Sequence, residues 1–152
     1  MTTDRQRLGE FGERLVCKRS NCPRCKRPAT LRRLPTNFKC ADVICDFCGY
    51  LAQVKTMHSK VLDEVPNTVL GAAWSVQQER MNSGIFFPLF LVLVKSPREF
   101  SCHYLAADLQ SADIFSPRRA LSASARRSGW QGFTFVLREK KHAFVCLFWQ
   151  AF

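Results

Sequence analysis

The sequence predicts an α/β fold in which helices flank a mixed sheet and a small four-cysteine ribbon is embedded. The expected elements follow the order α-β-β-α-β-β, which favours helices packed on the faces of a sheet. The nearly continuous apolar run at residues 85–95 has the length and composition of a buried central strand. Two CxxC pairs, at positions 22–25 and 45–48, mark the ribbon.

The first half of the chain is expected to begin with a helix over residues 5–18. Its apolar residues recur at helical spacing, and Arg, Glu and Lys occupy the other face. Residues 20–37 are polar and basic, which suggests a loop or ribbon. Strands are expected at 38–44 and 50–57, joined by the tight turn CDFCG, and residues 58–70 are expected to form a loop.

The second half begins with an expected helix at 71–81, whose small apolar residues suit packing against a sheet. The central strand at 85–95 follows, and another strand is expected at 102–109. Residues 124–128 are expected to form a short turn of helix. Residues 133–137 and 143–149 have the pattern of closing strands.

The composition indicates a folded, basic protein. Hydrophobic residues make up 47% of the 152 residues, enough for a sizeable core in one domain. The formal net charge is +11, and a charge of this size in a small domain most often indicates a nucleic-acid partner. Residues 1–39 alone carry eleven Lys and Arg against three Asp and Glu. An ordinary basic protein that binds no polyanion would show the same balance.

The N-terminus is charged throughout and has no signal-peptide pattern. The most apolar stretch is about half as long as a membrane span, so no membrane association is expected. Without an export signal, the eight cysteines are expected in a reducing compartment, where disulfides are rare. The sequence therefore predicts a cytoplasmic protein.

The two CxxC pairs predict a structural zinc site formed by Cys22, Cys25, Cys45 and Cys48. A CxxC turn directs two thiolates at a point ~2.3 Å from each sulfur, and two such turns complete a tetrahedron. Nineteen residues separate the pairs, a spacing typical of zinc sites. Four cysteine ligands leave no open position, so the zinc would be structural rather than catalytic. The alternative is four unrelated buried cysteines.

The two expected strands around the second CxxC pair also carry a second pattern. Gln53 and Lys55 share a strand face because they are two residues apart, and a hairpin would bring Asp42 opposite them. An Asp followed by acid-x-Lys on the adjacent strand is the arrangement of metal-dependent nucleases. The Asp oxygens suit Mg²⁺, the metal activates water for attack on a phosphate, and the Lys stabilises the growing charge. Alone, so short a pattern is weak, because such residues are usually surface residues.

The stretch CPRC…FKCADVICDFCGYLAQVKTM resembles the catalytic core of DpnI-type restriction endonucleases, also described as the Dam-replacing family. The resemblance continues through Gly71, Ala72 and Ala73, the apolar strand IFFPLFLVLV, and LSASARRSGWQG at 121–132. These motifs keep the family's order over roughly residues 21–149. The resemblance implies one PD-(D/E)xK nuclease domain, 1–152, of restriction-endonuclease-like fold, with a zinc-ribbon insert at about 20–50.

By position, Asp42 resembles the family's metal-binding Asp, Gln53 stands where the family has an acid, and Lys55 matches the catalytic Lys. The resemblance implies catalytic Mg²⁺ held by Asp42 and Gln53, and zinc held by the cysteine quartet. Gln53 departs from the pattern, since its carbonyl oxygen can bind Mg²⁺ but brings no charge. Glu10 or Glu13 in the first helix would offer another carboxylate, although a solvated helix face explains both equally well.

The function expected from the resemblance is Mg²⁺-dependent endonucleolytic cleavage of double-stranded DNA in a restriction role, with adenine-methylated DNA as a target to test. One alternative is a non-catalytic DNA-binding protein on a degenerate nuclease scaffold, which Gln53 favours. Another is a structure-selective repair nuclease. Restriction enzymes often act as dimers, so a homodimer is among the assemblies to test, although no residue marks an interface.

The candidate DNA contacts come as two Arg pairs followed by an aromatic residue. Arg side chains bind phosphates through two parallel hydrogen bonds, and a Trp can stack on bases. Arg pairs are otherwise usually solvated, and a Trp beside Gly is as often part of a core. The expected contacts are Arg118, Arg119, Arg126, Arg127 and Trp130.

Overall fold

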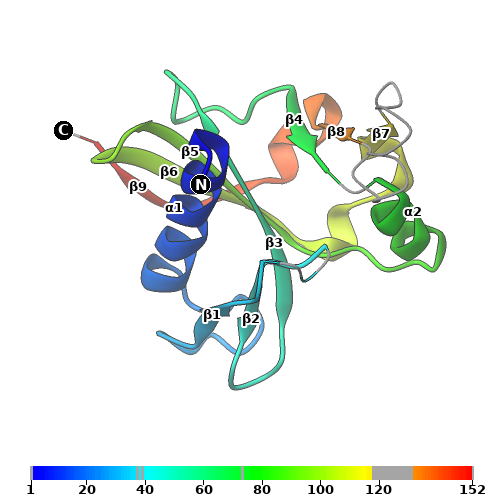
Figure 1. The fold of residues 1–152 in the computed structure, drawn as a ribbon, viewed down its shortest axis with the longest axis horizontal. Coiled ribbons are helices and arrows are strands. Elements are labelled where there is room, and N and C mark those ends of the chain that lie inside the picture. The colour runs from blue at the N-terminus through cyan, green and yellow to red at the C-terminus, as the bar shows by residue number, and fades with distance from the viewer. Residues whose placement is uncertain (1, 37, 39, 73, 118–131, 152) are drawn as a thin grey trace.

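The computed structural model describes residues 2–36, 38, 40–72, 74–117 and 132–151 (Figure 1). The fold is α/β, as the sequence predicts. The α-helices are α1 (Asp4–Arg19) and α2 (Trp74–Asn82). The strands are β1 (Leu31–Arg33), β2 (Val43–Cys45), β3 (Leu51–His58), β4 (Thr68–Gly71), β5 (Leu89–Ser96), β6 (Glu99–Leu105), β7 (Phe115–Pro117), β8 (Phe133–Val136) and β9 (Val145–Gln150).

The strands form two sheets. Six of them lie in the order β1-β2-β3-β5-β6-β9, and three form a smaller sheet in the order β4-β8-β7. The β3–β5 pair is parallel, and its connection runs through β4 and α2, while the other described pairs are antiparallel. A parallel pair needs such a long crossover, whereas an antiparallel pair does not. The larger sheet is therefore mixed, as the sequence predicts.

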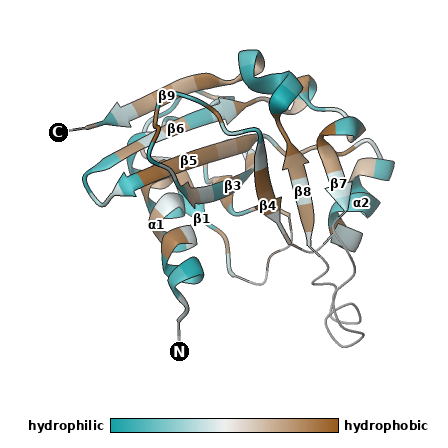
Figure 2. Cartoon of the chain, turned by 90° about the horizontal axis from the view of Figure 1, so that it is seen from above, coloured by the Kyte–Doolittle hydropathy of each residue, from teal (hydrophilic) through white to brown (hydrophobic). Residues whose placement is uncertain are grey.

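β5 lies at the centre of the molecule and is buried on both faces. Phe90, Val92 and Val94 belong to the apolar cluster beneath α1. The alternate leucines of β5 belong to a second cluster, which the smaller sheet covers. This double burial explains the continuous apolar run, and Figure 2 shows β5, β4 and β8 brown over much of their length.

α1 extends one residue beyond the predicted helix at each end. Thr3 caps it: the Thr3 hydroxyl accepts from the Gln6 N–H, and the Gln6 side chain accepts from the Thr3 N–H. The helix packs closely on β3 at Gly12, where a Cβ would collide with the Thr56 hydroxyl. This approach places the next residue, Glu13, beside the strand.

Three strands, β2, β1 and β4, differ most from the sequence prediction. The strand expected at 38–44 is extended only from Val43, because Cys40 has a φ of 70°, which no strand residue adopts. β1 lies in the region expected as a loop or ribbon, where the sequence pattern did not locate a strand. β4 lies in another expected loop, and its strand partner, β8, is far along the chain. Pairing between distant segments leaves no local signal.

The remaining elements lie near their predicted positions with shifted bounds, and β6 begins three residues before the strand predicted at 102–109. α2 begins at Trp74, because Gly71 ends β4 and the Phe133 ring fills the space that a side chain there would occupy. After β6, residues 107–109 form a short 3-10 turn rather than continuing the strand. The helical turn predicted at 124–128 lies outside the described residues. In the part of the chain that the structure describes, no helix has the length and apolar character to cross a membrane.

Candidate functional site

The four predicted zinc ligands converge. The sulfur atoms of Cys22, Cys25, Cys45 and Cys48 all lie within 4.8 Å of one another. The Sγ atoms of Cys22 and Cys48 are 3.6 Å apart, and those of Cys25 and Cys45 are 3.7 Å apart. A tetrahedron with ~2.3 Å zinc–sulfur bonds has edges of about 3.8 Å. The cluster therefore has the donor set and the dimensions of a four-cysteine metal site.

Each CxxC pair sits in a turn with the same backbone geometry. The residue four positions after the first cysteine, Lys26 or Gly49, has a φ of 67° or 77°. Its N–H donates to the carbonyl of that first cysteine, at 2.9 Å in both turns. Lys26 adopts this left-handed conformation although it has a side chain, which costs about 1–2 kcal/mol. The two turns are thus held in one conformation that directs their sulfurs inward.

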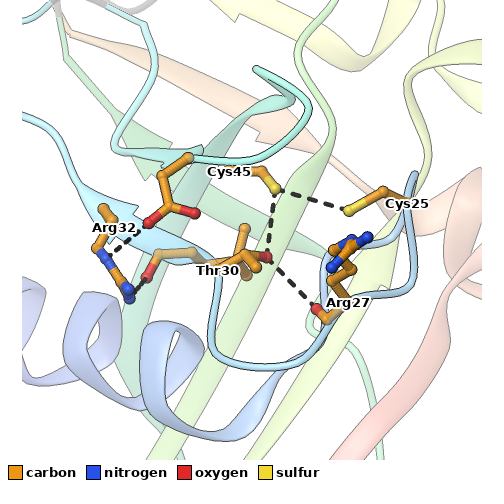
Figure 3. Close-up of polar contacts among 7 residues, drawn as sticks. Cys25, Arg27, Thr30, Arg32 and Cys45 are labelled. Atoms are coloured by element: carbon orange, nitrogen blue, oxygen red, sulfur yellow. Dashed lines mark hydrogen bonds and ion pairs between the residues drawn. The ribbon is translucent and has the colours of Figure 1, made fainter.

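The ribbon that carries the cysteines is tied to the first hairpin and to the central sheet. The Cys45 sulfur lies 3.2 Å from the Thr30 hydroxyl, and Figure 3 shows Thr30 between Cys45 and Arg27. The Tyr50 hydroxyl forms a short hydrogen bond with the Tyr104 hydroxyl of β6. These contacts connect the cysteine ribbon and the start of β3 to the rest of the sheet.

Asp42 lies just before β2 and is held against β3 by its backbone and its side chain. Its N–H donates to the Ala52 carbonyl at 2.9 Å, and its Oδ2 accepts from the Val54 N–H at 2.7 Å. Burial raises the pKa of Asp42, while the charge of Lys55 and the Val54 N–H act in the opposite direction. Asp42 and Lys55 are therefore close enough for their charges to interact, as the sequence pattern requires.

Lys55 lines a cleft beside β3. The cleft has a volume of about 760 Å³ and lies between the first part of α1, the second half of β3, and β4 with the residue that follows it. β2 pairs with β3 only through Leu51 and Ala52, so this half of β3 has a strand partner, β5, on one side. The cleft can thus admit a ligand to Lys55.

Gln53, the third residue of the sequence pattern, is held by α2. Its side chain is 4% exposed, and its Nε2 donates to the Gln77 Oε1 at 3.0 Å. Its backbone N–H donates to the Pro88 carbonyl. Gln53 lies two residues before Lys55 on β3, but its neutral amide is hydrogen-bonded to Gln77, and it is not among the residues that line the cleft. The Nε2 of Gln77 is buried and has no hydrogen-bond partner among the residues that the structure describes.

Glu13 of α1 brings a second carboxylate to the site. It lines the same cleft as Lys55, and its Oε2 accepts from Arg33 Nε and Nη2, both at 3.0 Å. Burial and the charge of Asp42 raise the pKa of Glu13, while Arg33 opposes them. The sequence offered Glu10 and Glu13 without distinguishing them. In the structure Glu10 instead pairs with Arg14 on the outer side of the helix.

The arginines and Trp130 predicted to contact DNA, at 118, 119, 126, 127 and 130, lie outside the described residues. The chain also carries a dense cationic segment, because residues 14–41 contain nine Lys and Arg and no Asp or Glu. Two of these arginines lie on aromatic rings of the ribbon. The Arg27 guanidinium is 3.7 Å from the Phe47 ring centroid, and that of Arg24 is 5.2 Å from Tyr50.

Comparison with known proteins adds one finding. No curated protein matches the chain. The family model described as DpnI, Dam-replacing family, matches residues 1–146, and so includes α1 as well as the region from residue 21 onward in which the sequence motifs lie. This family indicates a restriction-type nuclease whose substrate is DNA. The chain, with its four-cysteine cluster and its Asp42–Lys55 pair, belongs to the Dam-replacing family.

Proposed function

We propose that this protein is a metal-dependent endonuclease that hydrolyses phosphodiester bonds in double-stranded DNA. The role would be restriction, with adenine-methylated DNA as the target class that family membership favours. The four cysteines would hold a structural zinc ion, and the catalytic ion would be Mg²⁺.

The observation that carries this proposal is that Asp42 interacts with Lys55, and that Lys55 lines an open cleft. The two residues are thirteen positions apart in the sequence. Hydrogen bonds from the backbone and the side chain of Asp42 to β3 hold Asp42 near Lys55. Pairing a buried carboxylate with a lysine only for stability would leave no reason for a cleft at the lysine. A carboxylate next to an ammonium that lines an open cleft suits phosphoryl chemistry.

The residues present fit a hard divalent cation. Carboxylate and amide oxygens are the ligands that Mg²⁺ prefers, and Asp42 and Gln53 offer both types. When bound, the cation would polarise the scissile phosphate and make water a stronger nucleophile. Lys55 would bind a non-bridging phosphate oxygen and stabilise the negative charge that grows on it. Asp42 is kept in place for this role by the Val54 N–H.

The zinc ribbon would help to hold the DNA. Lys18, Arg24, Lys26 and Arg27 have no acidic partner within 4 Å among the described residues, so their charges are available to phosphates. Phe47 is exposed at the tip of the second CxxC turn, with Arg27 against its ring. Neutralising DNA phosphates releases counterions, which favours binding at low salt.

The test is digestion of plasmid DNA, with and without adenine methylation, in Mg²⁺ or Mn²⁺. The expected result is a set of discrete fragments that depend on the cation and on methylation. Lys55→Ala should abolish cutting, and Lys60→Ala, an exposed lysine outside the cleft, should not. Fragments that persist with Lys55→Ala would contradict this site. Cutting of nicked or branched DNA without sequence preference would instead indicate a repair nuclease.

A second function, DNA binding without cleavage, is favoured by the state of Gln53. Its uncharged amide stands at a position where an acid would strengthen metal binding, and its Nε2 already donates a hydrogen bond to Gln77. This alternative predicts DNA binding that is independent of Mg²⁺ and no cutting of either plasmid. Electrophoretic mobility shift with and without the cation separates the two functions.

A further inference from the structure

The tip of the second CxxC turn presents an aromatic ring to solvent. Phe47 lies between the two cysteines of that turn and is 59% exposed, the largest value among the large hydrophobic side chains that the structure describes. The Arg27 guanidinium lies 3.7 Å from the ring centroid and so covers one face. A ring that is covered on one face and is still so exposed offers its second face to solvent.

The ring and the guanidinium are both fixed by the turns that carry the cysteines. Arg27 follows the first turn directly, and its carbonyl accepts from the Cys22 N–H at 3.0 Å. Phe47 lies within the second turn, which the Gly49 N–H closes on the Cys45 carbonyl at 2.9 Å. The pair is therefore held in place before any ligand arrives, which lowers the entropy lost on binding.

The charges around the ring are positive or neutralised. Asp46, the acid next to Phe47, forms an ion pair with Arg32 at 3.1 Å. Arg24 and Lys26 of the first turn have no acidic partner within 4 Å among the described residues. A ligand that suits this surface combines a flat apolar face with negative charge. A nucleotide does so, because its base can stack on the ring while its phosphates meet the cations.

A purely structural role for the pair explains less. A cation–π contact between Arg27 and Phe47 would stabilise the ribbon equally well with the second face of the ring packed on the protein. A single exposed apolar side chain is common on protein surfaces and indicates no function alone. Here the exposed ring is backed by a guanidinium, fixed by two turns and set among unpaired cations. Those features together are typical of base-stacking sites.

We propose that Phe47, backed by Arg27, is a stacking site for an unpaired nucleobase of DNA. Arg24 and Lys26 would bind phosphates of the same strand. The inference rests on the proposed function, since it assigns a ligand to the ribbon that would help to hold the DNA. Bases inside a paired duplex are already stacked on both faces, so the ribbon would favour single-stranded or locally opened DNA.

The test measures binding of a labelled single-stranded oligothymidine to the zinc-loaded protein by fluorescence anisotropy, without Mg²⁺ so that no strand is cut. Phe47→Leu keeps apolar bulk but removes the ring, and should weaken binding at least about fivefold, as for the loss of one base–aromatic stack. Phe47→Trp should bind at least as tightly as the wild type. Trp149→Ala is the matched control, because it removes an exposed ring on β9, outside the ribbon, and should leave the affinity unchanged. Wild-type affinity in Phe47→Leu, or an equal loss in Trp149→Ala, would overturn the proposal.

A fluorescent base distinguishes stacking from a contact that involves the phosphates alone. The fluorescence of 2-aminopurine placed along the oligonucleotide falls when the base stacks on an aromatic ring. It should fall on binding to the wild type and change much less on binding to Phe47→Leu. Equal changes with both proteins, each saturated with the oligonucleotide, would overturn the proposal.

Duplex binding separates this inference from the function on which it rests. If the wild type binds duplex DNA and Phe47→Leu binds the single strand as the wild type does, the DNA function stands and the stacking site is wrong. If the wild type binds neither form, the proposed function itself is wrong. Should Phe47→Leu fail to hold zinc, Phe47→Trp replaces it. Its added indole fluorescence should be quenched by oligothymidine, and unquenched fluorescence would overturn the proposal.

Discussion

The four-cysteine ribbon and the proposed cleavage site both bring together distant side chains, but they are built in opposite ways. The ribbon takes its four cysteines from two short turns of the same conformation, and its ligands face only one another. The proposed cleavage site draws on Glu13, Asp42 and Lys55, which come from a helix, a loop end and a strand, and two of them, Glu13 and Lys55, line an open cleft. The cysteine cluster would stabilise the fold when it binds zinc, whereas the buried charges of the proposed cleavage site lower its stability.

The difference shows in the electrostatics. In the ribbon, a bound zinc ion would offset the charge of the thiolates on which it depends. In the cleavage site, burial raises the pKa of Asp42, and burial and Asp42 raise that of Glu13. Functional sites commonly carry such unfavourable placements. Variants of the ribbon should therefore affect folding, and variants of the site should affect activity with little loss of fold.

The largest effect is expected from Cys45→Ser, which removes a ligand at the point where the ribbon joins β2. Structural zinc sites contribute about 10–16 kcal/mol of binding free energy to folding, so the variant should yield no soluble, folded protein. Metal analysis of the wild type should find one zinc per chain. The control is Cys146→Ser, because Cys146 is exposed and lies outside the cluster. A folded, metal-free wild type would show that the ribbon is not a zinc site.

The next effect concerns the arginines outside the described residues. Arg126→Ala with Arg127→Ala should weaken DNA binding several-fold. The slope of log K against log salt should fall by about 0.9 for each phosphate that the protein no longer neutralises. The measurement is fluorescence anisotropy over a salt series, with Lys60→Ala plus Lys140→Ala as a charge-matched control. An unchanged slope would remove these arginines from the DNA interface.

Gln53→Glu sharpens the comparison by adding charge to the site. Gln77 can turn its amide so that its unpartnered Nε2 donates to the new carboxylate, so the change should be accepted by the fold. Mg²⁺ affinity should rise several-fold, measured by calorimetry, and less Mg²⁺ should be needed for cleavage. Gln78→Glu on the exposed side of α2 is the control. Weaker Mg²⁺ binding would indicate that Gln53 does not face the cation.

The smallest effect concerns stability and pH. Because burial raises the pKa of Asp42 in the folded state, the ionised form is less favourable there than in the unfolded chain. In the zinc-loaded protein without Mg²⁺, the free energy of unfolding should fall as pH rises from the ordinary pKa of an Asp through the raised pKa of Asp42. The full penalty should remain at neutral pH. Asp42→Asn keeps an oxygen for the Val54 N–H and removes the charge. Its Tm at neutral pH should rise by roughly 2–4 °C per kcal/mol of relief. A lower Tm would show that the Asp42 charge stabilises the fold.

The fold was predictable where the signal is local. The capped helix α1 and the apolar strand β5 follow from short-range periodicity, and both are close to their predicted bounds. The local signal did not locate β1 within the expected loop or ribbon, and it missed β4, whose strand partner is the distant β8. A single residue, Cys40 with a φ of 70°, ended the predicted strand early. Neither the pairing of distant strands nor a positive φ can be predicted from amino-acid composition.

The site shows the same division. Spacing alone identified the four cysteines, because CxxC turns bring their own ligands together. Asp42 and Lys55 needed the hairpin to meet, and the sequence pattern anticipated that. It did not separate Glu13 from Glu10, since both lie on the polar side of one helix and only the packing of Gly12 on Thr56 distinguishes them. Nor did it indicate that Gln77 would hold the amide of Gln53.

The most direct test of the central claim, that Asp42 and Lys55 act together as one cleavage site, is a double-mutant cycle. Single-turnover cleavage of an adenine-methylated duplex in Mg²⁺ would be measured for wild type, Asp42→Asn, Lys55→Ala and the double variant, with duplex affinity measured in parallel. Each single variant should lose about 10²-fold or more in rate, and the double variant should be little slower than the slower single variant. Independent, multiplicative losses, or rates that fall only in step with DNA binding, would contradict the account.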